Sequence, residues 1–385
     1  MRQVLGTWAE TYDGAEGGKL LVVEEKEEKY VVLAEEKTGS SVSFIAQDAE
    51  KALLFALLEI RQSGKDAGGL ICQYDCSAGK PVLLKAANSC GAYPVDMILT
   101  REYAVVLNHG STKNWIVRTE RTAQGGFKTC REYDEASLVL FARDEDGTTG
   151  DILDLCKIFG HGDLAFFQDS ASPHSLFFYE AEEEIYVPER GTDQVSVFAI
   201  DRSAGRLEKV GILESEKGYG PRNVIVSGGG EYVYVMHEIA PVIAVYRRRK
   251  TESGTLCFER IQELHTVSDE MNDRTQHEAT SFEAPHPVDM GITGDGKMLF
   301  CLTRSVNCIT AFSIGRDGKL AMEQCEKMKG VNPRQLAIDR NGLLAVALDS
   351  GTVERWDIKE GKAVWSHYLV SGIPRLAVMG KVCRI

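Results

Sequence analysis

Two arginines, a glutamate and a histidine occupy comparable places in a repeated pattern of the chain. His174 and Arg222 each follow a proline that opens a repeat, and Glu238 and Arg304 each come at the end of an apolar run. A carboxylate or a neutral imidazole can take a proton from water, and arginines stabilise the charge that develops on a carbonyl oxygen. If the fold brings the four side chains together, they can support attack of water on an ester carbonyl.

The pattern that must position these residues is a degenerate repeat of roughly forty to fifty residues. A unit opens with a proline and an alternating apolar strand, and turns containing Gly or Asp separate the strands that follow. The clearest unit starts at Pro287 and has Asp-Gly turns at 294–297 and 316–319. Alternation between such turns is typical of half-buried antiparallel strands. Other units start at Pro94, Pro173, Pro221, Pro333 and Pro374, and a weaker one starts near Ser43.

The two ends of the chain are expected to complete one unit between them. Pro374 opens a unit that the chain is too short to finish, and strands near 20–23 and 30–33 can supply the rest. Closing the ring in this way removes a free sheet edge. We therefore predict an all-β, seven-bladed β-propeller with four-stranded antiparallel blades, forming a single domain over residues 1–385. The wide spacing of two units predicts insertion loops on one rim at about 118–135 and 268–283.

Composition narrows the class of partner. The 385 residues carry a formal net charge of −13, which disfavours binding to nucleic acids or anionic membranes. Ten cysteines lack the CxxC spacing of metal sites, so we expect them to be reduced in a cytoplasmic protein, with no metal or cofactor. The chain opens without the apolar region of a secretory signal. Ring closure leads us to expect a monomer.

Several short motifs, in a constant order, resemble those of the lactonase propeller family, which includes a bacterial 6-phosphogluconolactonase and a fungal carboxy-muconate cyclase. Residues 220–223, Gly-Pro-Arg-Asn, resemble its Gly-Pro-Arg-His motif, and residues 173–175 resemble its Pro-His-Ser motif. Further similar segments lie at 191–198, 203–207, 236–239, 302–305 and 332–339. The resemblance extends from about residue 92 to the C-terminus. Asn223 stands in place of the family's usual His, and His237 in place of its usual Asn, and both changes bear on the substrate.

The resemblance implies an enzyme that hydrolyses an anionic sugar lactone, most concretely 6-phosphogluconolactone to 6-phosphogluconate. It implies that His174, Arg222, Glu238 and Arg304 form the catalytic site. Either Glu238 or His174 would be the base, and the two arginines would bind the anion and stabilise the oxyanion. Further substrate contacts are expected from Arg334, His286 and His237.

Two other functions remain open at this point. A muconate-cyclising isomerase would use the same residue types, and a propeller without catalytic activity could bind a metabolite or a protein. In that last case, His174 would be a structural histidine, Arg222 would anchor a loop, and Glu238 would only pair with an arginine. The enzymatic hypotheses fail if the four side chains do not face one cavity.

Overall fold

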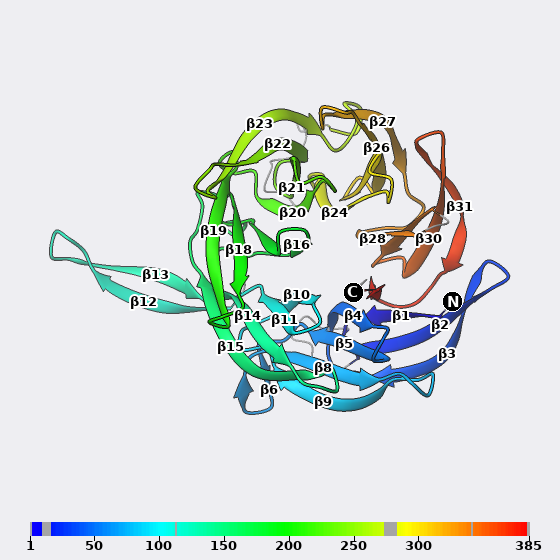
Figure 1. The fold of residues 1–385 in the computed structure, drawn as a ribbon, viewed down its shortest axis with the longest axis horizontal. Helices are drawn as coiled ribbons and strands as arrows, with labels where there is room; N and C mark the ends of the chain where they lie inside the picture. The colour runs from blue at the N-terminus through cyan, green and yellow to red at the C-terminus, as the bar shows by residue number, and fades with distance from the viewer. Residues whose placement is uncertain (1, 10–16, 112–113, 273–282, 340–341, 383–385) are drawn as a thin grey trace.

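The computed structural model describes residues 2–9, 17–111, 114–272, 283–339 and 342–382. Within these residues, seven sheets are arranged radially around a common centre (Figure 1). Each sheet has four antiparallel strands, and one has a fifth strand added at its inner edge. The predicted seven-bladed β-propeller is therefore confirmed.

The blades are described from the innermost strand outward. The blade that joins the two ends of the chain consists of β32 (Leu376–Met379), β1 (Arg2–Thr7), β2 (Lys19–Lys26) and β3 (Lys29–Lys37). The second blade consists of β4 (Val42–Asp48), β5 (Leu53–Leu58), β8 (Leu70–Asp75) and β9 (Val82–Asn88). The third consists of β10 (Pro94–Leu99), β11 (Tyr103–Asn108), β14 (Ala136–Arg143) and β15 (Thr149–Ile158).

The other four blades follow the chain order without interruption. The fourth blade consists of β16 (Phe177–Tyr179), β17 (Glu184–Glu189), β18 (Gln194–Asp201) and β19 (Arg206–Glu214), and the fifth of β20 (Pro221–Val226), β21 (Tyr232–His237), β22 (Val242–Lys250) and β23 (Leu256–His265). The sixth blade consists of β24 (His286–Ile292), β25 (Met298–Arg304), β26 (Cys308–Ile314) and β27 (Leu320–Lys327). The seventh consists of β28 (Pro333–Asp339), β29 (Gly342–Ala347), β30 (Thr352–Lys359) and β31 (Lys362–Val370).

Strands from both ends close the ring, as predicted. β32 forms the innermost strand of a blade whose other three strands come from the N-terminal segment, and Leu5 of β1 pairs with Met379. β33 (Lys381–Val382) then pairs in parallel with β4 of the neighbouring blade. The chain ends therefore fasten two adjacent blades to each other.

The hydrophobic core lies between the blades, because each sheet buries both of its faces against its neighbours. One cluster joins Leu20 and Val22 of β2 to Ile45 of β4 and Leu54 of β5. Clusters of the same kind fill the other spaces between adjacent blades. This packing explains the apolar second and third strands that mark each repeat, and it holds the innermost strands rigidly around the centre.

The expected insertions take different forms. The segment at about 118–135 is a two-stranded hairpin, β12 (Trp115–Arg121) and β13 (Phe127–Tyr133), that projects away from the ring (Figure 1). The insertion is a β-ribbon and not an irregular loop, because Trp115–Arg121 pairs along its whole length with Phe127–Tyr133. The segment at about 268–283 lies largely outside the described residues. A short hairpin, β6 (Gln62–Ser63) and β7 (Asp66–Ala67), extends a third connection.

An insertion that the repeat spacing did not reveal follows β15. Residues 159–176 cross from β15 to the innermost strand of the next blade by way of turns and bends. Among the described residues, no helix has the length and apolar character needed to cross a bilayer.

Candidate active site

The innermost strands share a local irregularity that turns side chains toward the channel. In five blades, strand pairing skips one residue shortly after the strand begins, which is the signature of a β-bulge. A bulge re-aims the side chain of the extra residue. The skipped residues all line one cavity, and they are Ser43, Val95, Arg222, Val288 and Arg334. In the blade of β16, the register shift between Pro173 and Phe177 contains His174, which lines the same cavity.

A second ring of side chains comes from the ends of the second strands. In six blades, the residue just before the first-strand irregularity pairs with a residue at the end of the second strand, and the residue after that partner also lines the cavity. These equivalent residues are Trp8, Glu59, His109, Arg190, Glu238 and Arg304. The propeller therefore converts distant but equivalent sequence positions into two adjacent layers of one site.

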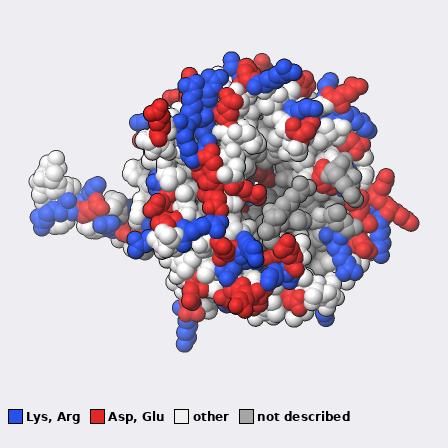
Figure 2. Space-filling model, viewed as in Figure 1, with Lys and Arg blue, Asp and Glu red and all other residues white. Residues whose placement is uncertain are grey.

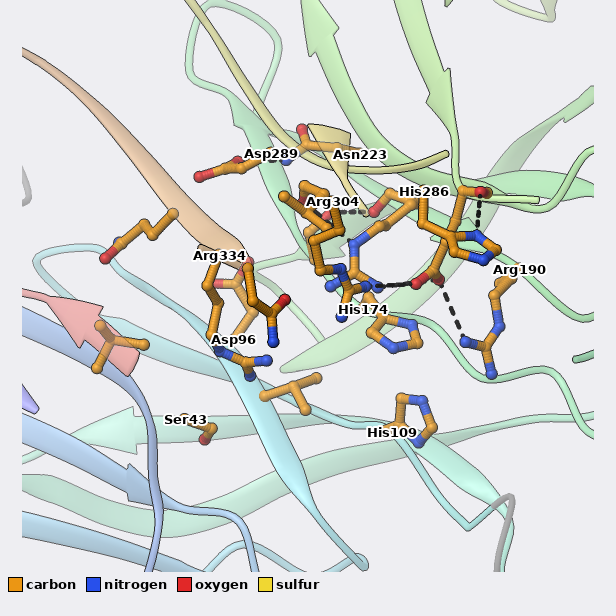
Figure 3. A pocket seen from close by; sticks show the side chains of 18 of the residues that line it. Ser43, Asp96, His109, His174, Arg190, Asn223, His286, Asp289, Arg304 and Arg334 are labelled. Carbon is orange, nitrogen blue, oxygen red and sulfur yellow. Dashed lines mark hydrogen bonds and ion pairs between the residues drawn. The ribbon is translucent and has the colours of Figure 1, made fainter. Parts of the chain in front are cut away.

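The cavity occupies the centre of the ring and has a volume of about 630 Å³. This is within the usual range for small-molecule sites. Figure 2 shows acidic and basic side chains interspersed over the viewed face, which is hollowed near its centre. Figure 3 shows the side chains that line the pocket, with His174, Arg190, Arg304 and His286 gathered on one side.

Glu238 is at the centre of this cluster and contacts three guanidinium groups. Its Oε2 lies 2.9 Å from Nη1 of Arg222 and 3.2 Å from Nη1 of Arg190, and its Oε1 lies 2.8 Å from Nη2 of Arg304. The Glu238 side chain is only 6% exposed. Burial alone would raise the pKa of this carboxyl, but Arg222 and Arg190 outweigh burial and hold the pKa well below its usual range. Glu238 is therefore a carboxylate that organises three cations.

The three arginines retain capacity for a further anion. Nε of Arg222 donates to the carbonyl oxygen of Val288, whereas the Nε atoms of Arg190 and Arg304 are buried and have no hydrogen-bond partner among the described residues. Burial and the neighbouring Arg222 lower the pKa of Arg304. Three guanidinium groups against one carboxylate leave an excess of two positive charges. We refer to Arg190, Arg222, Arg304 and Glu238 as the arginine cup.

Two neutral histidines adjoin the cup. Nδ1 of His174 lies 2.9 Å from the carbonyl oxygen of Ser172, so this nitrogen carries the proton and Nε2 is the basic nitrogen. Burial and the charge of Arg222 hold the pKa of His174 well below its usual value. The ring of His109 meets that of His174 edge to face, with 4.3 Å between centroids. Burial, together with Arg190, lowers the pKa of His109 to about 4.

His286 supports the cup from the side. Its Nδ1 donates to the backbone carbonyl of Glu238 over 3.0 Å, and its ring stacks on Phe167 with 5.7 Å between centroids. Arg190 lies over the Phe167 ring, with Cζ at 5.9 Å from its centroid. Both aromatic rings line the cavity.

Arg334 provides a cation on another part of the wall. Its guanidinium lies over the indole of Trp8, with Cζ at 3.8 Å from the centroid, and Nη2 is 3.8 Å from Oε2 of Glu59. In Figure 3, Arg334 lies on the opposite side of Arg304 from Arg190. Its charge contributes to the lowered pKa of Arg304, so the two guanidinium groups interact.

Of the seven residues predicted to form the site, the structure brings six to the cavity and excludes His237. His237 is fully buried, its Nδ1 faces the carbonyl oxygen of Val242, and its Nε2 accepts from the hydroxyl of Ser215 at 2.6 Å. Successive side chains of a strand point to opposite faces. Because Glu238 points into the channel, the preceding His237 points into the blade, and the expectation that it contacts substrate is corrected.

Sequence reasoning missed Arg190 and His109. A signal was available, because both residues directly follow a second strand, as Glu238 does. Asn223 has a structural role: its Nδ2 donates to Oδ1 of Asp289, whose Oδ2 accepts from the backbone of Leu336 in the next blade. These bonds tie neighbouring blades together at the wall of the cavity.

Fold and site together define a class of protein, a seven-bladed β-propeller with a cationic small-molecule pocket in its central channel. The chain belongs to the family described as Lactonase, 7-bladed beta-propeller, whose model matches residues 6–362. At the level of the family, the predicted resemblance is confirmed, and lactone hydrolysis is the activity for which this family and the curated relatives below are named.

Individual relatives are distant. The chain is 25% identical over 248 residues to a 6-phosphogluconolactonase of Formosa agariphila, and 26% identical over 190 residues to a 6-phosphogluconolactonase of Enterobacter sp. (strain 638). These matches span 62% and 48% of this chain, and 66% and 53% of the two relatives. The structure of a periplasmic gluconolactonase from Pseudomonas aeruginosa superposes with a TM-score of 0.74, covers 98% of both chains and is 18% identical, a likeness of fold.

Proposed function

We propose that the protein hydrolyses a phosphorylated sugar lactone, most concretely 6-phosphogluconolactone to 6-phosphogluconate. The observation that carries the proposal is the arginine cup beside a neutral histidine in one central channel. The three arginines of the cup and the neighbouring Arg334 supply cations both for a developing oxyanion and for a separate phosphate group, as a phosphorylated lactone requires. The relatives named 6-phosphogluconolactonase agree with this substrate class.

In the proposed reaction, His174 is the general base. Its Nε2 is unprotonated at neutral pH, because burial and Arg222 keep the imidazole neutral. Glu238 is unsuited to this role, since three arginines hold its carboxylate in the charged form and occupy both of its oxygens. We therefore assign Glu238 the task of positioning the arginines.

The chemical steps follow from these assignments. His174 takes a proton from water as the water oxygen bonds to the lactone carbonyl carbon, and the carbonyl oxygen becomes an oxyanion. Arg222, with Arg190 beside it, stabilises that charge. The bond between this carbon and the ring oxygen then breaks, and the proton on His174 passes to the ring oxygen, which gives a hydroxyl and a carboxylic acid. The acid then releases its proton to solvent.

The distal phosphate is assigned to the side of the cavity formed by Arg304 and Arg334. Their charges interact, Nε of Arg304 has no hydrogen-bond partner among the described residues, and Arg334 is held over the indole of Trp8. A planar guanidinium fixed in this way loses little freedom when it binds phosphate. This arrangement separates the reacting carbonyl from the group that anchors the substrate.

The proposal extends to the setting of the reaction. We propose a cytoplasmic enzyme that acts as a monomer, on a small anionic substrate and without a nucleic-acid or membrane partner. The net charge of −13 and the nine free cysteines among the described residues support this proposal.

The test is proton release by purified protein on 6-phosphogluconolactone, gluconolactone and muconolactone, corrected for spontaneous hydrolysis. The proposal predicts the highest kcat/KM for the phosphorylated lactone. It also predicts loss of turnover in His174→Gln and Arg222→Ala. Equal rates on all three lactones, or full activity in both variants, would overturn the assignment of substrate and roles.

A further inference from the structure

An exposed aromatic side chain stands on the channel wall without a role in the chemistry described above. Phe166 belongs to the insertion between β15 and β16 and lines the cavity, yet it is 66% exposed. Its backbone has φ of +67°, in the left-handed region that a bulky residue rarely adopts. Residues held in this region cluster at ligand-binding sites, where the surrounding structure enforces them.

The surrounding segment is held firmly enough to enforce this conformation. Gln168 is fully buried, its backbone carbonyl accepts from the amide of Gly162, its backbone amide donates to the carbonyl of Leu164, and its side-chain amide donates to the carbonyl of Arg190. A Cβ at Gly162 would lie 2.4 Å from Oε1 of Gln168, so the turn requires glycine there. The segment is thus bonded to the backbone of a cup residue.

The next residue in sequence fixes the position of Phe166 relative to the site. Phe167 is buried, stacks on His286 and lies beside Arg190. Consecutive Cα atoms are about 3.8 Å apart, so the backbone of Phe166 adjoins a residue that contacts Arg190 of the arginine cup, and Phe166 lines the same cavity as the cup. Cζ of Arg131, in the hairpin β12–β13, lies over the Phe166 ring at 5.6 Å from its centroid and over the Trp115 ring at 4.9 Å from its centroid.

We propose that Phe166 is a platform for the substrate ring, against which the apolar C–H face of a cyclic sugar lactone packs. The inference rests on the proposed function and deepens it, because it says how the site recognises a ring as well as an anion. The arginine cup can bind any compact anion, including free phosphate. A flat aromatic surface next to the cup favours a cyclic ligand, since contact between the two flat faces buries apolar area on both.

The test compares Phe166→Ala and Phe166→Tyr with the matched control Phe159→Ala. Phe159 is as exposed as Phe166 (65%) and begins the same insertion, but it does not line the cavity. With 6-phosphogluconolactone, Phe166→Ala should raise KM about 5- to 10-fold, which corresponds to roughly 1–1.4 kcal/mol of binding. The kcat should stay within about twofold of wild type on the same reasoning. Phe166→Tyr, which keeps the ring, and Phe159→Ala should both retain the wild-type KM.

Two further measurements separate ring packing from a distorted wall and from failure of the proposed reaction. The inhibition constant of inorganic phosphate should be unchanged in Phe166→Ala, because phosphate uses only the arginines. Calorimetric titration with gluconolactam, a ring that is not hydrolysed, should show the same loss of affinity without turnover. An unchanged KM and lactam affinity in Phe166→Ala, or a parallel weakening of phosphate, would overturn the inference. Lactam binding that depends on Phe166, in a protein that hydrolyses no lactone, would overturn the proposed function alone.

Discussion

Replacing Glu238 with glutamine tests whether this carboxylate organises the site. The change keeps the size of the side chain but removes the only negative charge of the arginine cup, so that three guanidinium groups face one another. Breaking a buried ion pair by removing one partner costs about 3–5 kcal/mol. Unfolding entropy of about 2.1 cal/mol/K per residue gives roughly 0.8 kcal/mol/K for 385 residues. A loss of 4 kcal/mol should therefore lower Tm by about 5 °C.

Glu189→Gln is the matched control. Glu189 is also a buried glutamate at the end of a second strand, one blade earlier, but its side-chain oxygens accept from the hydroxyls of Ser196 and Thr192. Burial raises the pKa of its carboxyl, so a neutral amide is a milder change. Altering such hydrogen bonds costs about 0.5–1.5 kcal/mol of unfolding free energy. By the same conversion, the Tm of Glu189→Gln should fall by roughly 2 °C or less.

The assay is thermal unfolding of the wild type and both variants at pH 7, without and with phosphate. Glu238→Gln should show the larger fall in Tm, and phosphate should restore more of it than in the wild type, because the unbalanced cup binds a dianion more strongly. Lactone turnover should fall at the same time. Equal Tm values for the two variants, or a phosphate effect no greater than in wild type, would refute the view that Glu238 balances the cup.

Three further outcomes are expected. His174→Gln should lower kcat/KM for the lactone by about 10²- to 10⁴-fold with Tm little changed, and a kcat/KM within threefold of wild type would remove His174 as the base. Arg334→Met should raise KM while kcat stays near wild type, because a distal anion contact binds ground and transition states alike; a selective fall in kcat would instead place Arg334 at the reacting carbonyl. Burial and Arg190 lower the pKa of His109 from its usual 6.5 to about 4 in the fold, so the stability that depends on its neutral form is fully present above pH 6.5 and is lost as pH falls toward 4. At about 1.36 kcal/mol per pKa unit, the loss of folding free energy approaches 3 kcal/mol. The Tm of His109→Gln should therefore fall less than that of the wild type between pH 7 and 4.5. An equal fall in Tm for the two proteins would contradict the lowered pKa of His109.

The repeat and its closure could be predicted because each blade must bury both faces. That requirement produces apolar second and third strands in every unit, and proline at the start of an innermost strand is compatible with strand pairing there. The bulge that follows Pro221 explains why Arg222 was recognisable as a channel residue. The incomplete unit at Pro374 predicted closure correctly for the same reason, since its strand needs three partners.

Other parts of the site depended on information that the motifs do not carry. His237 and Glu238 stand in one motif, and only strand alternation decides that one faces the blade and the other the channel. Arg190 was missed because it comes just before the family-like motif at 191–198, which is explained by the strand that it contains. The wall formed by residues 159–176 has no periodic pattern, so its packing on Arg190 and His286 could not be predicted from local sequence.

The central claim is that the channel hydrolyses an anionic sugar lactone with His174 as base and the arginine cup as the site of charge stabilisation. The most direct measurement is the pH dependence of kcat/KM for 6-phosphogluconolactone, followed by proton release. Because the pKa of His174 lies well below its usual value, kcat/KM should stay level from pH 8 down through pH 6.5 and fall only at lower pH, and His174→Gln should abolish the level region. A profile that falls through pH 6.5, or a wild-type rate no faster than the spontaneous reaction, would contradict the account.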